Sequence, residues 1–446
     1  MEVVGLIAFL AGILLISGVS GRIKNTIITL PILYVLFGLC IGLIFRDQIA
    51  LGVRDPLVQI IAQLTLMLVL ATDSSRIKVH SVITNHTLPL RLLGICLPLT
   101  ILLGTVLAAV IFGQLEFWEA AILAIILAPT DASLGESVVS NRRVPVRIRQ
   151  ALNVESGLND GIAMPFLILA VSLAVSTETQ VGTGYYIGIA ASQVIFGVLA
   201  GAMIGYLGAR YLIWGRTSGW MSVIFEKINW LAMVLLTFWI AELIGGNGYI
   251  AAFVFGMTSG NVIGAKGMKS LDDFAETENS LLMLATYMIF GMVVLLPALE
   301  RINLPVVIYA VLSLTIVRMI PVAVGLIGTK LQKVSVLFIG WFGPRGIASI
   351  LYVLTVLETD KVAGVGTIYT VAMITVFMSV LAHGISAAPI ADWYGGYISK
   401  LDKKGIATAE TTMVPEIPTR GESLSAQSYS SSQQNIKTNP GGAGHA

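Results

Sequence analysis

Charged side chains inside apolar stretches are the residues of this chain best placed to do chemistry. An ionised group near the centre of a bilayer costs about 2.5–3.5 kcal/mol to insert, so it needs a partner or a function. The residues placed in this way are Asp131, Glu155, Asp160, Glu242, Arg318 and Arg345, with Asp73 at the end of a further stretch. A structural ion pair is the alternative for any one of them, but so many together favour an intramembrane site for ions or protons.

The first of these carboxylates follows a proline in the segment AAILAIILAPTDASLGESVVS. Pro129 lacks an amide hydrogen and clashes with the carbonyl group of Ile125, so the helix should break there. The break frees carbonyl oxygens beside the Thr130 hydroxyl, and the second half-helix directs its positive end at Asp131. Such oxygen ligands suit a hard cation such as sodium. An ordinary proline kink is the alternative.

The next apolar segment, QALNVESGLNDGIAMPF, carries a polar wedge. Four-residue spacing puts Ser156 and Asp160 on one helical face, with Glu155 and Asn159 on the adjoining face. Asp160 lies about two turns into the helix, where burial favours the protonated carboxyl group and permits proton exchange at physiological pH. We therefore predict that Asp160 binds the transported ion, whereas Glu155 is expected to pair with a buried arginine.

A second interruption occurs in the segment GWFGPRGIASI, where helix-breaking residues surround Arg345, namely Gly343, Pro344 and Gly346. The two breaks are about 215 residues apart and fall in the fifth and twelfth predicted spans, so they should have opposite orientations in the bilayer. This pattern indicates an inverted repeat whose broken helices cross near the midplane. We expect Arg345 and Arg318 to neutralise negative half-helix ends and to hold Glu155, with a purely structural role as the alternative.

The composition identifies the elements that must position these residues. Of 446 residues, 56% are hydrophobic and 12% are charged, whereas a typical soluble domain is about half apolar and a quarter charged. This rules out an ordinary soluble enzyme and predicts an all-α polytopic membrane protein. About thirteen spans are expected, near residues 2–19, 28–45, 57–72, 90–112, 118–138, 151–175, 185–212, 229–245, 248–262, 278–298, 304–328, 333–357 and 365–390.

The distribution of positive charge predicts the orientation. With the N-terminus outside, most of the 27 Lys and Arg residues fall in cytoplasmic loops, and those in outer loops are Arg46, Arg54, Arg301 and Lys361. From about Gly421 onward the chain is rich in Ser, Gln, Asn and Gly. We therefore expect residues 400–446 to form a disordered cytoplasmic tail.

Other features argue against other classes of protein. The net charge of +2 gives no basic field for a nucleic-acid partner, and the absence of a GxxxxGK[ST] phosphate loop argues against a nucleotide partner. Cys40 and Cys96 lie in apolar runs and indicate neither a disulfide framework nor a metal site. His383 is expected to pack rather than to serve an intramembrane hydrolase. A cation channel is a rival class, although two half-helix breaks fit alternating access better.

Three motifs, APTDA at 128–132, ESGLNDG at 155–161 and FGPRG at 342–346, resemble those of the NhaP-type sodium/proton antiporters in the monovalent cation:proton antiporter-1 family. AELIGGNGYIAAFVFG at 241–256 is also similar to a glutamate-containing span of that family. The resemblance extends to about residue 390. It implies a thirteen-helix homodimer in which a core transport domain moves against interface helices; the core would comprise residues 88–176 and 303–392, and the interface residues 1–75 and 185–300.

The resemblance also implies roles for individual residues. The aspartate matching Asp160 would bind either sodium or a proton, and the metal ligands would be Asp160, Asp131, Thr130 and Ser156. An acidic group at the position of Asp73 can complete the site. Asn159 before Asp160, in place of a second aspartate, resembles the electroneutral branch that exchanges one cation for one proton. Glu155 and Arg345 would form the structural ion pair.

Together these patterns predict a secondary antiporter rather than an enzyme. Asp160 carries either a proton or a monovalent cation, sodium or lithium, and competition between them couples the two fluxes. Potassium/proton antiport by the same mechanism is the alternative. We expect membrane lipid as a partner, no resident cofactor beyond the transported ions, and a location in the inner membrane of a prokaryotic cell.

Overall fold

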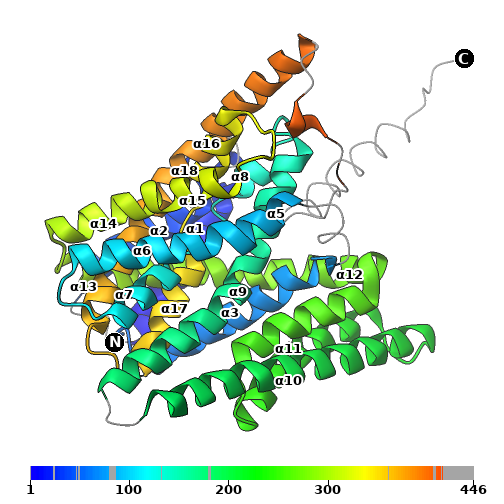
Figure 1. Cartoon of the computed structure of the whole chain (residues 1–446). Coiled ribbons are helices and arrows are strands. Elements are labelled where there is room, and N and C mark those ends of the chain that lie inside the picture. Colours follow the sequence, from blue (N-terminus) through cyan, green and yellow to red (C-terminus); the bar gives the residue numbers. More distant parts are fainter. Residues whose placement is uncertain are drawn as a thin grey trace, which may run out of the picture.

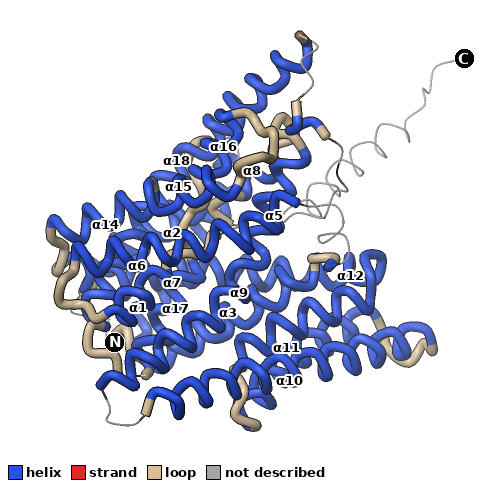
Figure 2. Tube along the Cα trace, viewed as in Figure 1, coloured by secondary structure: helices blue, strands red, loops and turns tan. Residues whose placement is uncertain are grey.

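The computed structural model describes residues 2–23, 26–46, 48, 51–79, 87–131, 133–178, 182–359, 361–404, 408–412 and 414. Within these residues all regular structure is helical (Figures 1 and 2). In chain order the elements are α1 Glu2–Ile23, α2 Leu30–Ile44, α3 Pro56–Ser75, α5 Thr87–Arg91, η1 Leu92–Cys96, α6 Leu97–Ile111, α7 Phe117–Ile126, α8 Glu136–Val139, α9 Val146–Glu178, α10 Thr183–Thr217, α11 Val223–Leu243, α12 Gly248–Ile289, η2 Phe290–Val294, α13 Leu295–Leu299, α14 Leu304–Leu314, α15 Ile316–Gly325, α16 Lys333–Trp341, α17 Ile347–Glu358, α18 Val365–Lys403 and η3 Ala409–Thr411.

Described helices overlap each of the thirteen predicted spans. Among the residues that the structure describes, eight helical segments are long and apolar enough to cross a membrane. Shorter apolar helices occupy further predicted spans, namely Ile7–Ile23, Leu30–Ile44, Phe117–Ile126, Gly248–Gly264 and Ile347–Glu358. The long helix α12 contains the predicted span near 248–262 and the first part of the span near 278–298, and its backbone departs from helical geometry between them at Gly264, where φ is 76°. Glycine permits this left-handed conformation without steric cost.

Short polar side chains start several of the helices. The carboxylate of Asp55 accepts a hydrogen bond from the amide of Leu57 in the first turn of α3. The side chain of Asn247 accepts from the amides of Tyr249 and Ile250 in the first turn of α12. Asp and Asn are favoured at this position because they satisfy amide groups that lack a partner within the helix.

The helices pack closely through small residues. A β-carbon added to Gly201 of α10 would lie 2.4 Å from the carbonyl oxygen of Ala251 in α12. A β-carbon added to Gly256 of α12 would lie 2.0 Å from the carbonyl oxygen of Ala71 in α3. Small residues at such contacts are typical of helices that associate within membranes. Helices α10, α11 and α12 therefore form one packed group with α3, along the lower edge of Figure 1.

The described C-terminal residues differ from the predicted tail of residues 400–446. Helix α18 extends to Lys403, and residues 409–411 form the short helix η3. Glu410 is fully buried and accepts hydrogen bonds from the amide of Gln332 and the hydroxyl of Ser335. The polar composition that predicts disorder gives no sign that one carboxylate of this segment, Glu410, binds the start of α16. Residues 405–407, 413 and 415–446 lie outside the described residues.

Candidate functional site

The two predicted helix breaks meet in space. Between α7 and α8, and between α16 and α17, the chain leaves the helical conformation around Pro129 and Pro344. The amide of Asp131 donates to the carbonyl oxygen of Pro344 at 2.8 Å. The amide of Ile347 donates in return to Oδ2 of Asp131 at 2.7 Å. The interrupted helices therefore contact each other where both are unwound, and we call this contact between the two breaks the crossing.

Asp131 is the most extensively hydrogen-bonded side chain of the crossing. Its Oδ1 accepts from the amide and hydroxyl of Ser133, at 2.7 and 2.5 Å. Its Oδ2 accepts from the Tyr287 hydroxyl at 2.9 Å, in addition to the amide of Ile347. The carboxylate, 8% exposed, thereby lies at the positive N-terminal end of α17, where negative charge is stabilising. Four donors hold Asp131 in a single orientation.

Arg345, in the second break, lies against negative helix ends, whereas Asp131 lies against a positive helix end. It is fully buried, and its amide donates to the hydroxyl of Ser379 at 2.7 Å. Its Nη1 donates to the carbonyl oxygens of Gly343 and Pro129, at 2.8 and 3.4 Å. These carbonyl groups follow the C-terminal ends of α16 and α7, where positive charge is stabilising. The guanidinium lies where the sequence predicts a cation against the negative half-helix ends.

Glu155 pairs with Arg318, and this corrects the pairing with Arg345 implied by the family resemblance. Nη1 of Arg318 donates to Oε1 of Glu155 at 2.6 Å, and Nη2 donates to Oε2 at 2.8 Å. Both side chains are buried. Gly343 leaves room for this arrangement, because a β-carbon there would lie 2.5 Å from Nε of Arg318. The guanidinium of Arg345 is instead directed at carbonyl groups of the two breaks.

The polar wedge of α9 contacts the first break through Thr130. The Thr130 and Ser156 hydroxyl oxygens lie 3.0 Å apart, and Nδ2 of Asn159 donates to the Thr130 hydroxyl at 2.7 Å. Asp160 lies one turn after Ser156 and is buried, with 7% of its surface exposed. Its carbonyl oxygen accepts from the Tyr352 hydroxyl of α17. The structure thus brings Thr130 of the first break against Ser156 and Asn159 of α9, within one turn of Asp160.

Asp73 reaches the same part of α9 from α3. It is buried, and a β-carbon added to Gly157 would lie 3.9 Å from Cβ of Asp73 and 3.7 Å from its carbonyl oxygen. Gly157 directly follows Ser156, so α3 approaches α9 beside the polar wedge. The role that the resemblance implies for Asp73 stays a prediction.

Two further polar residues singled out in the sequence have structural contacts. Glu242, at the end of α11, accepts from the amide of Gly248 at 2.7 Å and so ties α11 to the start of α12. His383 is fully buried, and its Nε2 lies 2.9 Å from the carbonyl oxygen of Trp341. The ring centroids of His383 and Trp341 are 4.9 Å apart. His383 therefore packs within the core, as predicted.

Some site residues have no clear signal in the sequence. Ser133 follows Asp131 at a spacing typical of a local turn between an Asp side chain and a later amide, so its contact could have been anticipated. Tyr287 and Tyr352 lie in apolar helices, where a tyrosine is most often a packing residue. Their hydrogen bonds to Asp131 and Asp160 depend on long-range packing that spacing does not reveal.

Throughout the described part of the chain, no group of three His, Cys, Asp or Glu side chains is arranged to hold a metal ion. The hydroxyl oxygens of Thr130 and Ser156 are ligands of the kind that hard cations prefer.

Comparison with known proteins decides the family. Residues 5–393 match the family described as "Sodium/hydrogen exchanger, transmembrane". The chain belongs to this family. It is 25% identical over 406 residues to the K(+)/H(+) antiporter NhaP of Alkalimonas amylolytica, which covers 88% of this chain and 67% of that protein. It is also 25% identical over 320 residues to the Na(+)/H(+) antiporter of Schizosaccharomyces pombe, covering 64% of this chain and 67% of the relative.

Solved structures show the same fold. The sodium proton antiporter MjNhaP1 from Methanocaldococcus jannaschii at pH 8 superposes with a TM-score of 0.69 at 20% identity, covering 86% of this chain and 100% of that chain. An electron-microscopy structure of the same protein gives a TM-score of 0.71 at 19% identity, covering 90% and 98%. The predicted all-α polytopic membrane fold and the NhaP-type family are therefore confirmed.

This sodium/hydrogen exchanger family member is an integral membrane protein and a secondary transporter that exchanges a monovalent cation for protons, as predicted, and is not an enzyme. The named relatives differ in their cation: the relative from Alkalimonas is named for potassium and the one from Schizosaccharomyces for sodium. The chain spans about two thirds of the length of these two relatives.

Proposed function

We propose that this chain exchanges one sodium ion for one proton by alternating access at a single site, in which Asp160 binds either ion but never both. The observation that carries this proposal is the position of Thr130 in the first break. Its hydroxyl contacts both Ser156 and Asn159 of α9, one turn from the buried Asp160. An unwound segment thus supplies oxygen atoms beside a carboxylate within an apolar bundle, as a dehydrated cation requires.

Glu155 and Asp131 have partners of their own, which supports the exchange of one cation for one proton at Asp160 in each cycle. Glu155 is neutralised by Arg318, and Asp131 accepts four hydrogen bonds in this structure. Asn159 is neutral, so Asp160 is the ionisable member of the adjacent pair. When Asp160 carries a proton or a sodium ion, the site crosses as a nearly neutral unit. The empty, ionised site crosses poorly because an ionised group within a membrane is costly.

Potassium/proton exchange by the same mechanism is the second candidate. It is favoured by the K(+)/H(+) antiporter name of the relative from Alkalimonas, which aligns with 88% of this chain. Thr130, Ser156 and Asp160 serve either cation, and the choice between them depends on the size of the cavity and on ligand distances.

The wider assembly is part of the same proposal. We place the chain in the inner membrane of a prokaryotic cell as a homodimer, with the N-terminus outside and the C-terminal tail in the cytoplasm. The core of residues 88–176 and 303–392 moves against the interface helices of residues 1–75 and 185–300. Exposed apolar side chains on α1 and α10, such as Leu14 and Leu199, provide surfaces for a second copy or for lipid.

Proteoliposomes containing the purified chain test this function. Sodium, potassium or lithium is added outside, and proton movement is followed with and without a protonophore. Sodium-dependent proton flux that survives collapse of the membrane potential, and disappears in Asp160→Asn, is expected. Asp392→Asn, which alters an exposed pair with Arg143, is the matched control and should behave as wild type. Proton-coupled sodium flux retained by Asp160→Asn would remove the assignment, and cation flux without protons would favour a channel.

A further inference from the structure

Tyr287 contacts Asp131 from a helix that belongs to neither break. The tyrosine is fully buried in α12; its hydroxyl donates to Oδ2 of Asp131 at 2.9 Å and lies 3.2 Å from the Ser133 hydroxyl. The remaining donors to Asp131 in the described chain are Ser133 and the amide of Ile347, which flank the breaks themselves. Tyr287 therefore connects the crossing to a separate part of the protein.

That separate part is the group of helices around α3 and α12. Thr286, the residue before Tyr287, lies with its hydroxyl 3.1 Å from the hydroxyl of Thr65 in α3, and both are buried. Close packing at Gly256 brings the backbones of α3 and α12 together further along. Tyr287 is thus fixed to α3 and α12, whereas Asp131 is fixed to the crossing.

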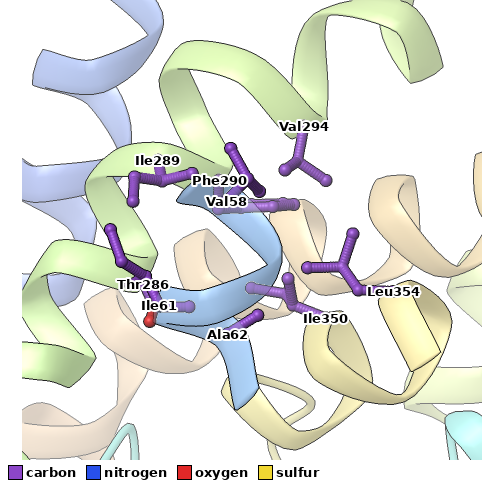
Figure 3. Close-up of a pocket in the computed structure, with 9 residues that line it drawn as sticks. All are labelled: Val58, Ile61, Ala62, Thr286, Ile289, Phe290, Val294, Ile350 and Leu354. Atoms are coloured by element: carbon purple, nitrogen blue, oxygen red, sulfur yellow. The ribbon is translucent and has the colours of Figure 1, made fainter. Parts of the chain in front are cut away.

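The seam between these two parts, where α17 meets α3 and η2, is mostly apolar and contains a small pocket lined in part by Thr286, the residue before Tyr287. Figure 3 shows a small pocket enclosed by α3, by the end of α12 with η2, and by α17. Its lining includes Val58, Ala62, Phe290, Val294, Ile350 and Leu354. Apolar contacts are non-directional, so they permit α17 to shift against α3 and η2. Hydrogen bonds across this seam are directional, and they discriminate between positions of α17.

Several hydrogen bonds cross the seam within the described residues, including one between Tyr249 of α12 and Thr355 of α17, and two others differ in depth. Nε2 of Gln63 in α3 donates to Glu358 at the end of α17 at 3.1 Å, and this contact is exposed. The bond from Tyr287 to Asp131 is buried at the other end of the seam, against the first turn of α17. A buried hydrogen bond to an ionised group contributes more than an exposed one. The hydrogen bond of Tyr287 therefore contributes more than that of Gln63 to holding the crossing in its present position.

We propose that Tyr287 is a positioning residue whose hydroxyl holds Asp131, and through it the start of α17, in the conformation of this structure. The bond breaks when the crossing moves against α3 and α12, so Tyr287 sets the balance between the two conformations of the transport cycle. This inference rests on the alternating access of the proposed function. It assigns to Tyr287 no contact with the transported ion.

Transport measured from each side of the membrane tests the proposal. Tyr287→Phe removes the hydroxyl and keeps the ring, so the site ligands remain and the conformation seen here becomes less populated. The apparent KM for sodium should then change by about three- to tenfold, in opposite directions in inside-out and right-side-out vesicles, because each side samples a different conformation. Loss of a merely structural contact would change both sides alike.

Tyr309→Phe is the matched control. Tyr309 is equally buried, but its hydroxyl donates to the carbonyl oxygen of Gly104 at 3.1 Å and not to a group of either break. This variant should leave the apparent KM unchanged on both sides. Equal shifts in the two variants, shifts in the same direction on the two sides, or no shift in Tyr287→Phe would overturn the proposal.

Hydrogen exchange separates this proposal from the proposed function. In detergent without added cation, the amides at the start of α17 should exchange at least several-fold faster in Tyr287→Phe than in wild type, and at the wild-type rate in Tyr309→Phe. This readout requires no transport. If the wild-type chain exchanges no sodium or potassium for protons, the proposed function fails, while unchanged protection of α17 in Tyr287→Phe would contradict the positioning role by itself.

Discussion

Each of the two breaks contains a proline, but the two breaks present different groups to the crossing. The first, between α7 and α8, offers the side chains of Thr130, Asp131 and Ser133. The second, between α16 and α17, offers mainly backbone, since the Pro344 carbonyl and the Ile347 amide are the groups that contact Asp131. In the proposed site the first break would supply ligands for the cation, and the second would hold those ligands in place. Substitutions in the first should alter ion affinity, and substitutions around the second should alter stability.

The largest expected effect concerns the ion pair behind the second break. Arg318→Leu leaves Glu155 buried without its partner, which should lower the free energy of unfolding by about 3–5 kcal/mol. Thermal unfolding in detergent measures this loss. Arg143→Leu, which removes an exposed pair with Asp392, is the control, because such pairs contribute about 0–1 kcal/mol. Equal melting temperatures for the two variants would mean that the buried pair does not support the second break.

Next in size is the close approach of the two breaks at Gly346. A β-carbon there would lie 2.0 Å from Oδ2 of Asp131, so Gly346→Ala must separate the breaks at a cost of about 1–3 kcal/mol. We expect a lower melting temperature and a lower maximal transport rate. Gly396→Ala, where the added β-carbon meets nothing within 4 Å, should match wild type. A fully active Gly346→Ala would show that the breaks need not touch.

A comparable effect on stability, together with a clear effect on affinity, is expected from the first break. Thr130→Val keeps the shape and removes the hydroxyl that contacts Ser156 and Asn159. Leaving the Asn159 amide without this acceptor costs about 1–3 kcal/mol, and the apparent KM for sodium should rise about tenfold. Thr105→Val, whose buried hydroxyl bonds only to its own helix at Ile101, is the control. A wild-type KM in Thr130→Val would mean that Thr130 is not a ligand of the transported cation.

The smallest effect lies at the far end of the helix that leads into the second break. Glu410→Gln keeps an oxygen that can accept from Gln332 and Ser335 but removes the charge at the start of α16. We expect a loss of about 1 kcal/mol in stability and an unchanged KM for sodium, measured by thermal unfolding and by vesicle transport. A large change in KM would mean that the tail acts on the site and not only on the fold.

The sequence predicts both breaks because proline disrupts a helix wherever it occurs within one. It also predicts the spans, since apolar length determines them, and the wedge of Ser156 and Asp160, since helical periodicity puts residues four apart on one face. These features depend on local rules.

Long-range packing determines what the sequence does not reveal. Arg318 and Arg345 both lie in apolar spans, and spacing alone does not say which of them reaches Glu155. Tyr287 has the same surroundings in sequence as a tyrosine that only packs. Glu410 lies in a polar segment that composition describes as disordered. In each case the partner lies far away along the chain.

The central claim is that sodium and protons compete for Asp160, and the pH dependence of wild-type transport tests it most directly. Initial rates of proton-coupled sodium flux are measured over a range of sodium concentrations at several pH values. Competition predicts that the apparent KM rises by up to about tenfold for each unit of acidification, while the maximal rate at saturating sodium stays constant. A KM that stays constant while the maximal rate falls with acidification would contradict a single shared site.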